Sequence, residues 1–331
     1  MSVPTVSCVI MCHNYGRYLD QAITSCATQE PGDYRLAEIV VIDDGSTDDT
    51  PTVCNRWAGK IKVIRRERQG FAASLTDAMR VSTGDWVALL DADDWFHTGK
   101  LRACAPHLRS QALLVQHWEY VVDGYSCPLI DQRHAGGNTS TLLVNRRAAQ
   151  PLVPVSNEIF FHALREVGRG VELREPLTYY RVHGLSMTDR RTPGISQDYR
   201  AGVTKEIADR LRGLRSNPPA WATRSQLRRA AAAFRAVASS HKVEAAVQRG
   251  TRRYALGALF RMAIATIRAG RPLKPWMRSL VSVTTGRPQA RLGVPVYDRG
   301  FRAAGADPPG SVTAVRQATK NVEPTRSEPS S

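Results

Sequence analysis

Two clusters of aspartates carry the strongest chemical signal in the sequence. Asp91, Asp93 and Asp94 stand within four positions, directly after the apolar run at 86–90. Three carboxylates this close repel one another unless a cation neutralises them. An oxygen-preferring divalent ion such as Mg²⁺ or Mn²⁺ does so and keeps open positions for phosphate oxygens. The alternative is a polar turn in which Asp94 caps the next helix.

The second cluster is Asp43-Asp44, followed by Gly45 and Ser46. A carboxylate at a strand end can accept a hydrogen bond from a nucleotide base or a ribose hydroxyl, and glycine lets the backbone approach a ligand closely. Taken alone, the segment is also explained as a strand-to-helix turn in which an aspartate side chain caps the backbone.

The elements around these clusters predict where they lie. Short apolar runs at 6–10, 38–42, 61–64 and 85–90 alternate with helical patterns at 18–29 and 70–80 and a helix start near Thr50. Such alternation predicts an α/β fold with a mostly parallel sheet flanked by helices. Ligand sites in these folds lie beyond the carboxyl ends of the strands, and both clusters stand at strand ends.

Four segments occur in order and together look like a known family. They are VSCVIMCHNYGRYLDQAITSCATQ, EIVVIDDGSTDDT, QGFAASLTDAMRVSTGDWVALLDADDWF and REPLTYYRVHGLSMT. They resemble the inverting transferases of glycosyltransferase family 2, over roughly residues 3–188. The resemblance implies a GT-A catalytic domain at 1–185, with nucleotide-sugar binding at about 1–100 and the acceptor side at about 101–185. It also implies a nucleotide-diphosphate sugar donor, UDP-linked by preference, and Mn²⁺ or Mg²⁺ as cofactor.

The resemblance also implies roles for individual residues. Asp44 matches the position that hydrogen-bonds the nucleotide base, and Asp91 matches the one that contacts ribose and sugar. Asp93 matches the metal ligand, and His183 matches a histidine that completes the metal shell in some relatives. Arg181 is expected to hold the diphosphate. A hydrogen-bonded structural histidine is the alternative for His183.

The catalytic base departs from the family pattern. Aligned on Ser156, the usual acidic pair becomes Asn157-Glu158, which places Glu158 where the base aspartate belongs. An alignment shifted by one residue would put Asn157 there, and an amide cannot take a proton. A catalytically degenerate scaffold of the same fold is therefore the alternative function.

The net charge of +16 is concentrated in one part of the chain. Residues 1–183 carry a net −2 and residues 184–302 a net +18. Helical patterns at 222–249 and 252–270 predict a basic helical extension over 186–284, and a Gly/Pro/Ser-rich tail at 285–331 is expected to be disordered. The segment 252–278 fits an interfacial helix on an anionic membrane, a helix packed on the catalytic domain, or a partner or dimer interface.

Composition excludes several other classes. No run approaches the about 18–20 apolar residues of a membrane span, and the N-terminus has no signal-peptide pattern. Six scattered cysteines favour a reducing compartment, so we expect a cytoplasmic protein, peripheral at the inner membrane face, that acts on a carbohydrate or lipid-linked acceptor. A basic nucleic-acid-binding protein is disfavoured because no such motif is present and because carboxylate clusters repel phosphate backbones.

Overall fold

The computed structural model describes residues 3–128, 137–183 and 194–286. These residues form an eight-stranded sheet in the order β3-β2-β1-β4-β7-β6-β8-β5. The strands are β1 (Thr5–Cys12), β2 (Arg35–Asp44), β3 (Lys62–Arg66), β4 (Trp86–Asp91), β5 (Trp95–Phe96), β6 (Leu114–Val122), β7 (Leu142–Asn145) and β8 (Gly170–Arg181).

Strands β3, β2, β1 and β4 are parallel, as the sequence predicts. The second half of the sheet is mixed, because β7 runs antiparallel to both β4 and β6, and β5 runs antiparallel to β8. The register pairs Cys12 of β1 with Asp43 on one side, and Met11 with Asp91 on the other. Both aspartate clusters therefore lie at the same edge of the sheet, on either side of the end of β1, as expected.

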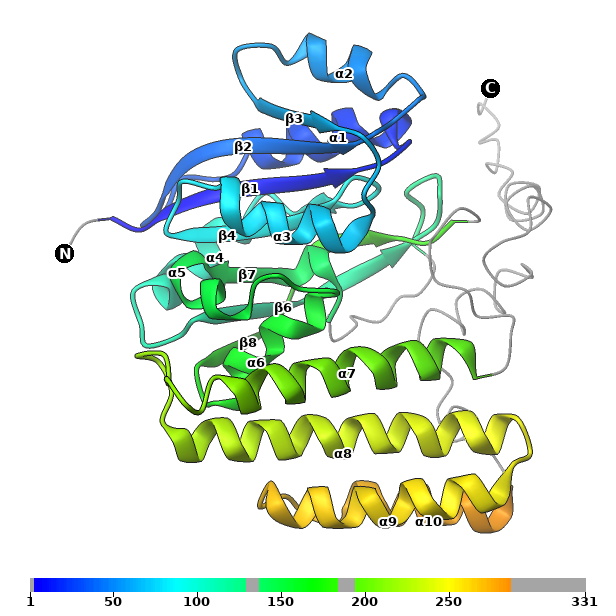
Figure 1. The fold of residues 1–331 in the computed structure, drawn as a ribbon. Coiled ribbons are helices and arrows are strands. Elements are labelled where there is room, and N and C mark those ends of the chain that lie inside the picture. Colours follow the sequence, from blue (N-terminus) through cyan, green and yellow to red (C-terminus); the bar gives the residue numbers. More distant parts are fainter. Residues whose placement is uncertain (1–2, 129–136, 184–193, 287–331) are drawn as a thin grey trace, which may run out of the picture.

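Helices cover both faces of the sheet (Figure 1). They are α1 (Gly16–Ala27), α2 (Thr50–Arg56), α3 (Phe71–Val81), α4 (Lys100–Leu108), α5 (Arg146–Ala149), α6 (His162–Glu166), α7 (Ile195–Gly213), α8 (Arg224–Gln248), α9 (Arg252–Arg268) and α10 (Lys274–Thr285), with 3-10 turns η1 (Thr139–Thr141), η2 (Gln150–Leu152) and η3 (Glu158–Phe161).

Alternate residues of β1 enter two different cores because successive strand side chains point to opposite faces. Val9 and Met11 pack with α3, and the same core takes in α7 and α8 through residues such as Ile207 and Phe234. Cys8 and Ile10 pack on the opposite face with α1 and α4. The helices after residue 194 are thus partly built into the core of the sheet domain.

The expected basic helical extension is present as α7 to α10. Figure 1 shows α7, α8 and the α9–α10 pair as successive layers beside the sheet. Helices α9 and α10 pack on α8 through a separate small core that includes Val243, Ala258 and Val283. The expected domain boundary near residue 185 and all but the first two residues of the expected disordered tail at 285–331 lie outside the described residues. Within the described ranges, no helix is both long and apolar enough to span a membrane.

Candidate active site

Asp93 and His183 meet at the carboxyl edge of the sheet. The Nε2 atom of His183 lies 3.0 Å from Oδ2 of Asp93. His183 lies two residues after the end of β8 and is buried, whereas 14% of the Asp93 side chain is exposed. The ring of Tyr15 packs edge-on against His183, with 5.6 Å between ring centres. The structure therefore brings together the two residues that were expected to hold a metal.

Asp91 ends β4 and is crowded by other carboxylates. Its pKa lies well above the ordinary range, because burial disfavours the charged form and because Asp93 and Glu158 repel it. A hydrogen bond from Thr139 acts in the opposite direction. Asp91, at the end of β4, therefore lies close enough to Asp93 in the following turn and to Glu158 in η3 for both charges to act on it.

Asp94 has a structural role that differs from the expected helix cap. It is buried, and the helix α4 begins only at Lys100. Its Oδ1 accepts the Arg181 backbone N–H at 2.8 Å, and its Oδ2 accepts the Ser140 hydroxyl at 2.6 Å. Asp94 therefore ties the turn after β4 to β8 and to η1.

Ser140 organises this edge and was not anticipated from the sequence. Its hydroxyl accepts the backbone N–H of Asp91 at 3.0 Å while donating to Asp94. Its carbonyl accepts from Lys100 Nζ and from the Thr178 hydroxyl, both at 2.8 Å. Lys100 is fully buried, and burial lowers its pKa to about 7. A serine in a loop carries no sequence signal for such a position.

Asp44 is held by protein donors. Its Oδ1 accepts from Arg66 Nε and the Gln69 N–H at 2.9 Å, and its Oδ2 accepts the Gly70 N–H at 2.7 Å. These bonds outweigh the opposing effect of burial and lower its pKa. An ionised carboxylate accepts about four hydrogen bonds, so one position is left for a nucleotide base.

Asp43 offers the less occupied carboxylate of this pair. Its Oδ1 accepts the Ser46 N–H at 2.9 Å. Its Oδ2 is buried and has no hydrogen-bond donor among the described residues, with Arg65 Nε at 3.5 Å as its nearest cation. A buried acceptor of this kind is rare without a partner, which makes Asp43 a candidate ligand contact beside Asp44.

Arg181 is largely occupied by the protein. Its guanidinium donates to the Gly124 carbonyl at 3.1 Å and to Gln21 at 2.7 Å. It also lies over the rings of Tyr18 and Trp95, at 4.1 and 4.8 Å from their centres. Only Nε is a buried donor without an acceptor among the described residues. Arg181 therefore braces the site and leaves one N–H for an anionic ligand.

Glu158 begins the turn η3, and Asn157 serves as its cap. The Asn157 side chain accepts the Ile159 N–H at 3.0 Å and lies 3.4 Å from the Tyr199 hydroxyl. Glu158 is half-buried, and this burial raises its pKa to about 7, against a smaller lowering effect of Arg200. The carboxylate is thus poised to exchange a proton near neutrality, while the amide of Asn157 is used in the turn.

The donor set fits a divalent cation shared with a phosphate ligand. Asp93 and His183 supply one oxygen and one nitrogen, and a cation beside them would offset the repulsion that raises the pKa of Asp91. The described residues contain no cluster of three or more acidic, histidine or cysteine side chains able to hold a metal by themselves. Mg²⁺ is commonly bound by one or two carboxylates with the remaining positions taken by water and substrate phosphates, so the arrangement fits.

Comparison with known proteins agrees with this fold. The structure resembles that of S. aureus TarS 1-349 in complex with UDP-GlcNAc, with a TM-score of 0.55 at 14% identity over 86% of this chain and 92% of that chain. That coverage includes part of the helical extension. The expected GT-A fold, an α/β fold with a curled sheet flanked by helices, is confirmed.

Sequence relatives point to the same class of protein. Residues 7–158, a little under half of the chain, match the model of glycosyl transferase family 2, which agrees with the expected family and with the expected glycosyltransferase class. The chain is 29% identical over 215 residues to an uncharacterized glycosyltransferase of Nostoc sp., covering 55% of this chain and 66% of that protein. It is 35% identical over 127 residues to the succinoglycan biosynthesis protein ExoU of Rhizobium meliloti, covering 37% and 34%. The chain thus spans two thirds of these relatives at most.

Proposed function

We propose that this protein is a metal-dependent inverting glycosyltransferase that moves a sugar from a nucleotide diphosphate to an acceptor hydroxyl. The observation that carries the proposal is the contact of Asp93 with His183 at the carboxyl edge of the sheet, next to Asp91, which is also within electrostatic reach of Glu158. The match of residues 7–158 to the model of glycosyl transferase family 2 supports the reaction class.

In the proposed reaction, the acceptor oxygen attacks the anomeric carbon as the bond from that carbon to the diphosphate oxygen breaks. The hydroxyl proton goes to the Glu158 carboxylate, and the nucleoside diphosphate leaves with the bonding electrons. A pKa of about 7 suits this base, because it is partly ionised near neutral pH and still binds a proton well.

The donor would lie across the ends of β2, β1 and β4. Asp43 and Asp44 would accept hydrogen bonds from the nucleoside, Asp91 would contact the ribose and sugar, and Arg181 Nε would donate to the diphosphate. Asp93 and His183 would hold Mn²⁺ or Mg²⁺ against the diphosphate, where the cation supplies Lewis-acid stabilisation of the leaving group. UDP is the first nucleotide to test, since a protein of the same fold binds UDP-GlcNAc.

A nucleotide titration and two variants test this assignment. Titration calorimetry with UDP, GDP and dTDP, each with Mn²⁺ and then with EDTA, is expected to show binding of one nucleotide that depends on the metal. Asp93→Ala is expected to remove the metal dependence, and Glu158→Gln to preserve nucleotide binding while transfer falls by about 10²–10⁴-fold. Nucleotide affinity of the wild-type protein that does not change with EDTA would contradict the metal site. Transfer that survives in Glu158→Gln would place the base elsewhere.

We further propose that the outer face of α9 and α10 contacts an anionic membrane on the acceptor side of the reaction. Leu256, Phe260, Ile267, Met277 and Val281 are exposed there, with Phe260 exposed to 68%. No acidic residue occurs between positions 252 and 285, whereas cations recur along both helices. Two copies of this face would repel each other, which disfavours a symmetric dimer. Anionic lipid would attract it by about 1 kcal/mol per basic residue.

Vesicle flotation tests this contact. The protein is expected to float with phosphatidylglycerol-containing vesicles and less with pure phosphatidylcholine. The pair Phe260→Ser and Ile267→Ser is expected to lose flotation, whereas Val63→Ser, at an exposed position of β3, keeps it. Equal flotation of all three proteins would contradict the proposed face.

A further inference from the structure

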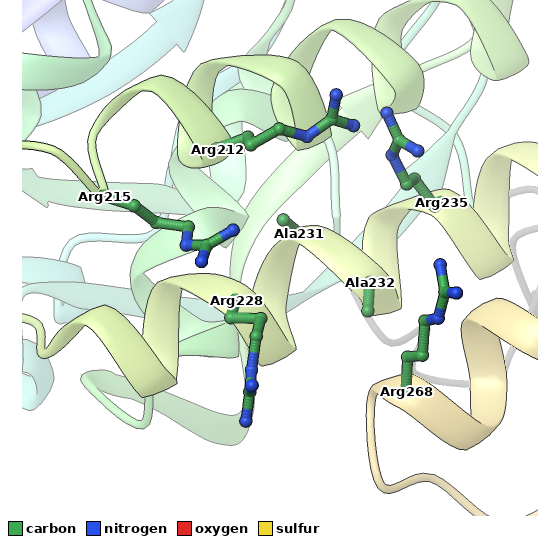
Figure 2. A pocket seen from close by; sticks show the side chains of 7 residues that line it. All are labelled: Arg212, Arg215, Arg228, Ala231, Ala232, Arg235 and Arg268. Carbon is green, nitrogen blue, oxygen red and sulfur yellow. The ribbon is translucent and has the colours of Figure 1, made fainter.

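A groove lined by cations runs between α7, α8 and α9, outside the aspartate edge. At one end it encloses a cavity of about 560 Å³, and Figure 2 shows the side chains of Arg212, Arg215, Arg228, Arg235 and Arg268 around it. A neighbouring cavity of about 370 Å³ shares Arg235 and Arg268 with the first and continues past Lys242 and Arg261. We call this continuous feature the cationic groove.

The cations of the groove recur with a regular spacing. On α8, Arg228, Arg235 and Lys242 are seven residues apart, and on α9 Arg261 and Arg268 have the same separation. Seven residues are about two helical turns, so these side chains lie on one face of each helix at intervals of about 10 Å. The groove therefore presents its positive charges in a line along its length, and they are not gathered at a single point.

Acidic residues balance little of this charge. Asp209 contacts Lys205 at 2.9 Å, Arg235 at 3.0 Å and Arg212 at 3.2 Å. Among the described residues, Arg215, Arg228 and Arg268 form no ion pair with a carboxylate. Confining like charges is unfavourable without counter-charges, so the groove attracts an anion.

The shape of the groove limits which class of anion it can bind. Its floor includes the small residues Ala231 and Ala232, which leave room for a chain between the arginines. Arginine binds carboxylate and phosphate in a two-pronged geometry. A concave groove does not match a flat bilayer. Among the residues that the structure describes, none that lines the groove is an aromatic side chain on which the bases of a single-stranded nucleic acid would stack.

One end of the groove lies near the proposed acceptor side. Lys205 adjoins Glu206 on α7, and the Glu206 carboxylate accepts the Ser156 hydroxyl at 2.7 Å. Ser156 is two residues from Glu158. The row of cations thus leads from the far end of α8 toward the turn that carries the proposed base.

We propose that the cationic groove binds a linear polyanion, a chain that repeats carboxylate or phosphate groups, as an anchoring site for an anionic acceptor polymer. The assignment to the acceptor rests on the proposed function, whereas the binding itself can be measured without turnover.

Fluorescence anisotropy with labelled polygalacturonate and labelled polyphosphate tests the groove and distinguishes the two anionic groups. The triple variant Arg215→Gln, Arg228→Gln, Arg268→Gln is expected to bind the preferred polymer at least tenfold more weakly. Its slope of log affinity against log salt is expected to fall by about two, at about 0.7 per lost contact. Neutral dextran is expected not to bind.

A matched control removes the same charge from the same region. Arg224→Gln, Arg229→Gln, Arg253→Gln changes exposed arginines on α8 and α9 outside the groove and is expected to alter polymer affinity less than twofold. Equal losses in both triple variants would overturn the proposal in favour of general charge attraction. Groove-dependent binding of an oligonucleotide or of anionic vesicles at least as tight as that of either polymer would overturn it in favour of those ligands.

Metal-dependent UDP binding in the groove variant separates the two proposals. If the groove proposal is wrong, the groove triple variant binds the polymers as tightly as the wild-type protein does, while UDP still binds. If the proposed function is wrong, UDP fails to bind the wild-type protein, whatever the polymers do.

Discussion

The carboxylates at the sheet edge differ in what surrounds them, and this difference sets their chemistry. Asp44 receives three hydrogen bonds from the protein, which lower its pKa. Glu158 and Asp91 are desolvated, and Asp91 also lies beside other acids, so their pKa values rise. Groups with divergent pKa values in one site can serve separate roles as ligand, electrostatic partner and base.

The raised pKa of Glu158 predicts the pH dependence of transfer. Below about pH 7 the carboxyl is protonated and cannot accept the hydroxyl proton, so kcat/KM is expected to fall about tenfold for each further pH unit. A pH–rate profile at subsaturating donor measures this acid limb. The residual activity of Glu158→Gln is expected to lack the limb. A limb that persists in this variant would assign the titration to another group.

Asp43 and Asp44 are adjacent in the sequence, but we expect substitutions at the two positions to affect different properties. Asp44→Asn places an amide against N–H donors of the 66–70 loop and is expected to cost about 1–3 kcal/mol of unfolding free energy. Asp43→Asn keeps an oxygen for Ser46 and removes the acceptor at Oδ2, so it is expected to weaken nucleotide binding with little change in stability. Urea unfolding and nucleotide calorimetry measure the two effects. Similar stability losses in both variants would contradict this division.

At the scale of single residues, the sequence predicts which groups carry chemistry better than it predicts their hydrogen bonds. The family resemblance predicts that Asp93 and His183 act together, and the structure places His183 Nε2 3.0 Å from Asp93 Oδ2. The three hydrogen bonds that Asp44 accepts depend on where the 66–70 segment returns to the sheet. That return is set by tertiary packing and leaves no local pattern.

At the scale of elements, the turn η1 links the two halves of the sheet edge. Ser140→Ala would leave Oδ2 of Asp94 without its donor and the Asp91 N–H without its acceptor. Buried groups without partners cost about 1–3 kcal/mol, so the free energy of unfolding is expected to fall by that amount. Ser216→Ala, in the exposed turn after α7, is the control and is expected to change stability by less than about 0.5 kcal/mol in urea unfolding. A Ser140→Ala variant as stable as the control would contradict the linking role.

The elements that the sequence predicts are those with strong local patterns. Buried parallel strands read as continuous apolar runs, which locates β1, β2 and β4, whereas the run at 61–64 marks the more exposed β3. Helices α8 and α9 begin and end within two residues of their predicted bounds. The antiparallel pairing of β7 was not predicted, and α7 falls within the expected helical extension without bounds of its own having been predicted. β7 has only four residues, and the pattern of α7 is interrupted by Gly202. Their positions are decided by the core into which they pack.

At the scale of the whole molecule, charge and packing divide the chain at different places. The positive charge begins after residue 183, but α7 and α8 share a core with α3 and the sheet. A composition boundary therefore does not coincide with a packing boundary. The cationic helices hold a fixed position relative to the aspartate edge through that core, which is what an anchoring groove for an acceptor requires.

This shared core predicts that damage to α8 destabilises the donor site. Phe234→Ala removes a buried aromatic side chain and is expected to lower the free energy of unfolding by about 3–5 kcal/mol in a single cooperative urea transition. Phe260→Ala, at an exposed position on α9, is the matched control and is expected to stay within about 0.5 kcal/mol of the wild type. If the helices instead formed an independent unit, Phe234→Ala would separate two transitions, and nucleotide binding would survive the first. A single transition that abolishes nucleotide binding and helicity together would establish that α8 belongs to the catalytic fold.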